Sequence, residues 1–114
     1  MQPGDGVSPE TVRHSLQKIM EVWQWDRGWG WDFPMAAMTA AKLNEPELAI
    51  RALTFESSKN RYLPNGHVYQ RRDLPAYLPA NGGLLAAVAM MALSGVFPKD
   101  GKWSVKTEGF SPLL

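Results

Sequence analysis

Tryptophan is concentrated in one short part of this sequence. Four of the five tryptophans lie between residues 23 and 31, where they alternate with glycine, aspartate and arginine. The apolar C–H faces of sugar rings stack on indoles, while sugar hydroxyls suit carboxylate and amide partners. Trp29 and Trp31 straddle a glycine that lets the backbone approach closely, so we predict that both bind a carbohydrate. Trp23 falls in the apolar stripe of a predicted helix, which indicates a core position.

One acidic residue, Asp32, directly follows the tryptophans. Inverting glycoside hydrolases need two carboxyl groups that flank the scissile bond and leave room for a water molecule. Asp32 is the plausible member of such a pair in this sequence, either as a base or as an acceptor for a sugar hydroxyl. The alternative is that it caps the helix that follows, a contribution of roughly 1 kcal/mol. The two roles are compatible, because a carboxylate has two oxygens.

Three further polar residues, His67, Gln70 and Asn81, lie in or beside a second long loop and are predicted to bind the same sugar. His67 follows the turn pair Asn65-Gly66, so a structural hydrogen bond is the alternative role for its imidazole. His14 is the only other histidine, and the acidic residues are not clustered. We therefore expect no metal site and no cofactor.

The composition argues against several classes of partner. The net charge is +1, and Arg71-Arg72 is the only basic pair in the middle of the chain, so nothing favours nucleic acid or an anionic membrane. The longest apolar stretch, residues 84–93, is too short to span a bilayer, and the first residues do not resemble a signal peptide. The absence of cysteine excludes disulfides and zinc-thiolate sites. It leaves the cellular compartment open.

Four helices are predicted from capping residues and hydrophobic spacing. Residues 9–25 follow a serine cap, begin with proline and an acid, and carry apolar residues at spacings of three and four, which is typical of an amphipathic helix. Residues 46–55 are predicted to form a second amphipathic helix. Residues 33–43 and residues 82–93, the latter capped by Asn81, are small and apolar on nearly every side. Such helices are usually buried all round.

The connections between these helices predict a fold. Residues 56–80 contain three prolines and no sustained period, which indicates a long loop, and residues 102–107 alternate as a strand within an extended tail, 96–114. Antiparallel packing of sequential helices would bring loops 26–32 and 56–80 to the same end. We therefore predict one all-α domain, residues 1–114, built from antiparallel helical hairpins with long loops at one end and a short C-terminal strand.

Three stretches carry a resemblance to a known family: residues 29–35 (WGWDFPM), 65–70 (NGHVYQ) and 77–85 (YLPANGGLL). With these motifs the sequence resembles the carboxy-terminal end of bacterial glycoside hydrolases of the six-hairpin, (α/α)6-barrel type. The similarity covers about residues 8–110. In that fold an inner ring of helices is wrapped by an outer ring, and the sugar pocket lies where loops enter the inner helices.

The resemblance implies an incomplete enzyme. Residues 33–43 and 82–93 resemble inner helices, and two hairpins make about a third of a six-hairpin barrel. The general acid of such enzymes lies earlier in the barrel. Related barrels that hydrolyse fucosides place a carboxylate directly before the last inner helix, where this chain has Pro79-Ala80. Asp32, in a setting similar to the trehalase-type signature, is the remaining catalytic candidate.

The expected function is therefore that of the C-terminal part of a carbohydrate-active enzyme, which supplies sugar-binding loops but not a complete catalytic set. The expected partners are a carbohydrate and either the remainder of the barrel or a second copy of the chain, packed against the two apolar helices. The alternatives are a non-catalytic carbohydrate-binding domain and a structural or oligomerisation domain in which the tryptophans contact protein.

Overall fold

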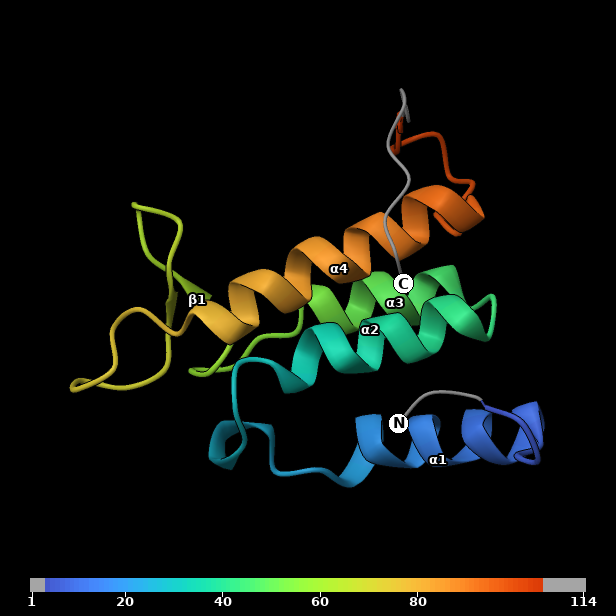
Figure 1. The fold of residues 1–114 in the computed structure, drawn as a ribbon, viewed down its shortest axis with the longest axis horizontal. Coiled ribbons are helices and arrows are strands. Elements are labelled where there is room, and N and C mark those ends of the chain that lie inside the picture. Colours follow the sequence, from blue (N-terminus) through green and yellow to red (C-terminus); the bar gives the residue numbers. More distant parts are fainter. Residues whose placement is uncertain (1–3, 106–114) are drawn as a thin grey trace.

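Helices dominate this computed structural model, which describes residues 4–105. The elements are α1 (Pro9–Val22), a 3-10 turn η1 (Trp25–Arg27), α2 (Asp32–Lys42), α3 (Pro46–Leu53), the short strands β1 (Arg61–Tyr62) and β2 (Val68–Tyr69), and α4 (Leu78–Ser94). Successive helices run in opposite directions, so the α1–α2 and α3–α4 connections lie at the same end (Figure 1). The predicted all-α class and the shared end of the two loops are confirmed. No helix within the described residues is long and apolar enough to cross a membrane.

Helix α1 begins where it was predicted but ends earlier. Pro9 occupies the first helical position, where a missing N–H costs nothing, and Glu10 lies in the favourable first turn. The helix ends at Val22 rather than near Trp25, because Trp23 has an extended backbone (φ −67°, ψ 139°). The chain then turns through η1. This early end changes which tryptophan faces the core.

Helix α4 begins earlier than predicted. Its first residue is Leu78, and Pro79 lies in the first turn, where proline is tolerated. Asn81 is consequently inside the helix, and the predicted cap at Asn81 is wrong, since Tyr77 occupies the N-cap position. The helix ends at Ser94 and is followed by Gly95, whose left-handed backbone (φ 63°) is a conformation that glycine adopts without strain.

The predicted loop 56–80 contains a β-hairpin that the sequence prediction missed. Strand β1 pairs with β2 in antiparallel register, with Tyr62 opposite Val68. Gly66 has φ +85° in the turn, and the Leu63 N–H donates to the His67 carbonyl oxygen at 2.9 Å. The pair Asn65-Gly66, flanked by aromatic and β-branched residues, is a recognised hairpin signal.

The predicted C-terminal strand, 102–107, is wrong for the part that the structure describes. Residues 102–105 have no strand hydrogen bonds, and residues 106 and 107 lie outside the described residues. A strand needs a partner edge, and the only two-stranded ladder within residues 4–105 is the hairpin β1–β2. The tail instead brings Trp103 against Phe97, with ring centroids 5.8 Å apart.

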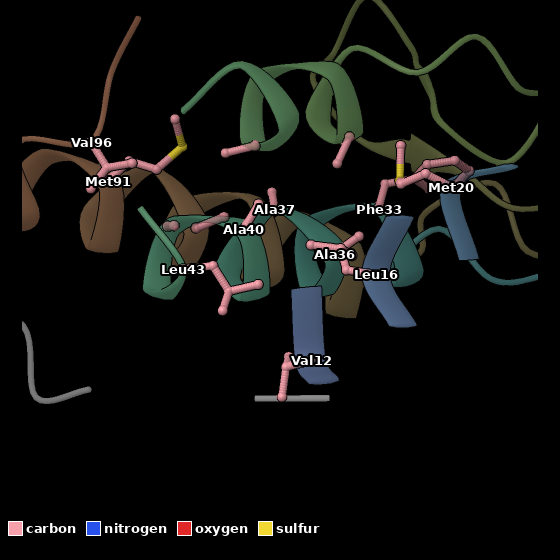
Figure 2. Close-up of a cluster of buried hydrophobic side chains, with 14 of the residues drawn as sticks. Val12, Leu16, Met20, Phe33, Ala36, Ala37, Ala40, Leu43, Met91 and Val96 are labelled. Carbon is pink, nitrogen blue, oxygen red and sulfur yellow. The ribbon is translucent and has the colours of Figure 1, made fainter. Parts of the chain in front are cut away.

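The core is centred on α2, which contacts each of the other three helices. Its alanines, Ala36, Ala37, Ala40 and Ala41, are all buried and let the neighbouring helices approach closely. Side chains from α1, α2 and α4 converge in this core, as Figure 2 shows for Leu16, Phe33 and Met91 among others. Helix α2 is therefore buried on most sides, as predicted.

Helix α4 is buried on one face only. Met91 and Ala87 point into the core, whereas Leu78, Leu85 and Val88 are exposed. Leu85 has 73% of its surface accessible, although α4 has no charged residue. An apolar face of this kind on a small domain is typical of a surface that contacts another protein.

Candidate functional site

An open groove lies beside the loop that connects α1 to α2, and we name it the tryptophan groove. Three of its lining residues are half-exposed indoles: Trp23 (51% accessible), Trp29 (42%) and Trp31 (45%). The full lining consists of Val22, Trp23, Gln24, Arg27, Gly28, Trp29, Trp31 and Asp32. The groove thus combines aromatic surface with one carboxylate and one guanidinium group.

Asp32 is held in the groove by a hydrogen bond to its own loop. The Trp29 N–H donates to Asp32 Oδ2 at 2.8 Å. The predicted N-cap role of Asp32 is wrong, because the residue is the first of α2 and Trp31 occupies the cap position. A Cβ atom on Gly28 would lie 2.6 Å from Oδ2, so a larger residue at this position would displace the Asp32 carboxylate. The second oxygen, Oδ1, accepts no hydrogen bond from residues 4–105 and is available to a ligand.

Gln70 supports the groove from beneath. Only 4% of this residue is accessible, and its Oε1 accepts a hydrogen bond from the Gly30 N–H at 2.8 Å. Its Nε2 donates to the Gly28 carbonyl oxygen at 3.2 Å. Both ends of the amide are therefore used to hold the tryptophan loop. Gln70 therefore lies at the predicted site, but it is buried beneath the groove and does not line it.

Gly30 sits where the hairpin and α4 press against the tryptophan loop. A Cβ atom at this position would lie 3.0 Å from the Lys59 carbonyl oxygen and 3.0 Å from Val68 Cγ1. The absence of a side chain allows the tryptophan loop to approach the hairpin and α4 this closely. The ring of Trp29 also lies 5.4 Å from the ring of Tyr77.

Two charged groups act on this corner of the groove. Burial raises the pKa of Tyr77, and the negative charge of Asp32 raises it further. The Arg71 guanidinium carbon lies 5.7 Å from the centroid of the Trp29 ring, in a cation–π arrangement. The same guanidinium binds Asp73 at 2.7 Å and lowers the pKa of that carboxyl group. Tyr77 therefore stays a neutral hydrogen-bonding phenol at physiological pH.

His67 and Asn81 are not brought to the groove. Asn81 Oδ1 accepts a hydrogen bond from the Val68 N–H at 3.1 Å, and its Nδ2 donates to the Gly66 carbonyl oxygen at 2.8 Å. This side chain ties the first turn of α4 to the hairpin. His67 lies in the hairpin turn, where its backbone N–H donates to Asn65 Oδ1 at 3.1 Å. Neither residue lines the tryptophan groove.

The prediction that Trp23 is a core residue is wrong, and Trp25 takes that place. Only 7% of Trp25 is accessible, and its ring centroid lies 5.0 Å from that of Phe33 and 5.2 Å from that of Phe55. The exchange follows from the early end of α1, which turns Trp23 outwards. Trp25 Nε1 is buried and has no hydrogen-bond partner in the described part of the chain. An unsatisfied buried donor costs about 1–3 kcal/mol.

Asp26 is next in sequence to the groove residue Arg27, and one of its carboxylate oxygens, Oδ1, binds the segment after α3. Its Oδ1 accepts hydrogen bonds from the Ser57 hydroxyl at 2.7 Å and from the Ser58 N–H at 3.0 Å. Both bonds lower the pKa of the Asp26 carboxyl group, and the bond from the Ser57 hydroxyl has the larger effect. A carboxyl group with a lowered pKa is a poor proton donor near neutral pH. Asp26 therefore connects η1 to the segment after α3.

The groove contains part of the predicted site and no second acid. Trp29, Trp31 and Asp32 line it together, and Asp32 is its one carboxylate among the described residues. No group of three or more His, Asp or Glu residues within 4–105 could hold a metal ion. Comparisons of the chain with protein-family models, curated proteins and solved structures found no match.

Proposed function

We propose that this chain binds a carbohydrate in the tryptophan groove and forms the C-terminal part of a glycoside hydrolase-like (α/α)6 barrel. The observation that carries the proposal is that three half-exposed indoles and the side chain of Asp32 line the same groove. Large rings of this kind are normally buried, and a folded chain that exposes three of them in one groove has aromatic surface for a ligand.

The chemistry of the groove suits a sugar. An indole face gives apolar contact to the C–H face of a pyranose, and Asp32 Oδ1 accepts a hydrogen bond from a hydroxyl. The guanidinium of Arg27 supplies donors on the same groove. The loop is fixed from beneath by Gln70, so little conformational freedom is lost when a ligand binds.

The proposed role of this chain is binding without turnover. Glycoside hydrolysis needs two carboxyl groups, about 5 Å apart in retaining enzymes and roughly 6.5–9.5 Å apart in inverting ones. Asp32 has no such partner in the groove within the described residues, because Asp26 does not line the groove and has a lowered pKa. Asp32 serves as a base only if another part of a barrel supplies the acid. We therefore expect the chain alone to be inactive.

An NMR titration with a panel of mono- and disaccharides tests the proposal. We expect the indole resonances of Trp23, Trp29 and Trp31 to shift with a bound sugar, while that of Trp103 does not. Trp103 is the matched control, since it is similarly exposed but lies in the C-terminal tail. Unchanged spectra with every sugar at high millimolar concentration would contradict carbohydrate binding.

The exposed face of α4 favours a second candidate function, assembly with another protein surface. Leu78, Leu85 and Val88 would contact either the remainder of a barrel or a second copy of the chain. We expect concentration-dependent association in sedimentation velocity, and we expect Leu85→Glu to abolish it. Glu47→Ala on the exposed surface of α3 is the control. A strictly monomeric protein at high concentration would contradict self-association.

A further inference from the structure

A small cavity lies between α1 and α2, behind the tryptophan groove. Its volume is about 110 Å³. Leu16 and Ile19 of α1 and Met35 and Ala36 of α2 make its walls predominantly apolar, and Thr39 and Asp32 are the polar residues of the lining. A protein cavity of roughly 150 Å³ with comparable walls takes up benzene. A cavity of this size accommodates a single small apolar group.

The cavity and the groove share two residues. The indole of Trp23 and the side chain of Asp32 line both. A ligand that donates a hydrogen bond to Asp32 in the groove is therefore next to the cavity. The other groove residues, Trp29 and Trp31, do not line the cavity, so the site has an aromatic polar half and an apolar half.

The buried indole of Trp25 also belongs to the cavity lining. Its Nε1 is the buried side-chain polar atom left without a partner within residues 4–105. Buried donors are nearly always satisfied in folded proteins, and an exception calls for a reason. The nitrogen itself is shielded from solvent, so Trp25 contributes ring surface to the cavity wall and no hydrogen-bonding group. Binding pockets commonly have this composition, apolar walls with few polar groups.

We infer that the cavity between α1 and α2 receives the apolar aglycone of a glycoside whose sugar lies in the tryptophan groove. The inference rests on the proposed carbohydrate binding and specifies the substrate class. A free sugar would leave the cavity unused, because a hydroxylated ring gains nothing from walls of leucine, isoleucine and methionine. A short alkyl or single aryl group attached to the sugar fits both the volume and the walls.

Isothermal titration with paired ligands tests this inference. Methyl and phenyl pyranosides of the same sugar and anomer are compared over a panel of sugars. We expect the phenyl glycoside to bind on the order of tenfold more tightly, because burial of the aryl ring removes its apolar surface from water. Equal affinities for the methyl and phenyl members of every pair would overturn the inference.

Two variants locate the effect. Ala36→Leu fills the cavity, and we expect it to abolish the preference for phenyl while the affinity for the methyl glycoside stays within about twofold. Ala86→Leu on α4, outside the cavity, is the matched control. If Ala36→Leu does not fold, Met35→Ala widens the cavity at a half-exposed position and should favour a naphthyl over a phenyl glycoside. Retention of the wild-type preference in the folded variant would also overturn the inference.

The outcomes separate this inference from the proposed function. Methyl and phenyl glycosides that bind equally, with shifts of the groove indoles, would leave sugar binding intact and remove the aglycone site. Free phenol that binds as tightly as the phenyl glycoside would show that the sugar contributes nothing, and both proposals would fail. The same double failure follows if no glycoside binds. A preference for the phenyl glycoside that is lost with free phenol and in Ala36→Leu supports both the sugar-binding proposal and the aglycone site.

Discussion

The tryptophan loop (residues 23–32) and the hairpin segment (residues 61–70) lie at the same end of the helices, and both are rich in aromatic and polar side chains. They use these side chains in opposite ways. The tryptophan loop turns three indoles and one carboxylate oxygen to the groove, whereas Gln70 at the end of the hairpin segment is turned inwards with both amide atoms bonded to the loop.

This difference shows that the type of a residue does not tell whether its side chain contacts a ligand or holds the protein together. Gln70 and Asp32 are both polar residues suited to sugar hydroxyls. Gln70 has its hydrogen-bonding capacity satisfied by Gly28 and Gly30, while Asp32 keeps one oxygen for another molecule. A polar group that is already satisfied gains little from a ligand. The number of internal partners, rather than the residue type, decides the role.

The largest expected effect is that of Trp25→Ala, which removes the buried indole of the tryptophan loop. Truncation of a buried tryptophan costs about 3–5 kcal/mol of unfolding free energy. Trp23→Ala removes a half-exposed ring two residues away and should cost about 1 kcal/mol or less. Urea denaturation of both variants measures the difference. Equal losses of unfolding free energy in the two variants would contradict the assignment of Trp25 to the core and of Trp23 to the surface.

Gln70→Ala should have the next largest effect. It leaves the Gly30 N–H and the Gly28 carbonyl oxygen without their partner in a buried position, at a cost of about 1–3 kcal/mol. Asn81→Ala removes a similar pair of bonds at a more exposed position, so we expect a smaller loss of unfolding free energy. Gln70→Ala should also weaken sugar binding, because the groove loop loses its support. Wild-type stability and affinity in Gln70→Ala would contradict the scaffold role.

Trp31→Ala should separate binding from folding. The half-exposed ring contributes about 1 kcal/mol or less to stability, whereas its loss should lower sugar affinity by roughly tenfold. Melting temperature and sugar affinity are measured on the same preparations, with Trp103→Ala as the control for an exposed indole outside the groove. A large drop in melting temperature with unchanged affinity per folded molecule would place Trp31 in the scaffold.

The smallest effect concerns acid stability at the base of the loop. In the folded chain, hydrogen bonds from Ser57 and Ser58 lower the pKa of Asp26 below its ordinary value of 3.8. The ionised carboxylate of Asp26 therefore stabilises the folded protein above about pH 4. This contribution is lost as the pH falls through the pKa that Asp26 has in the folded chain.

Asp26→Asn should therefore lower the melting temperature slightly at pH 7 and leave it closer to that of the wild type at about pH 2. Thermal melts of both proteins over this pH range make the comparison. A difference that grows as the pH falls would contradict the assigned role of Asp26.

Local signals were sufficient to predict the helices. Proline at the first position and an acid in the first turn mark the starts of both α1 and α3, because these preferences depend on neighbouring residues. The hairpin was predictable too, since Asn65-Gly66 between two short β-forming runs is a local pattern. Where a helix ended was less predictable, because α1 stops at Val22 without a glycine or proline to stop it.

The sequence by itself therefore determined the helical class, the starts of α1 and α3 and the presence of an exceptional tryptophan loop. Only the tertiary structure decided that Trp25 is buried and Trp23 exposed, and that Gln70 lies under the groove. The bond between Gly30 and Gln70 spans 40 residues, and the burial of Trp25 depends on Phe33 and Phe55. Propensity and periodicity act over a few residues, so contacts between distant segments appear only when the helices pack together.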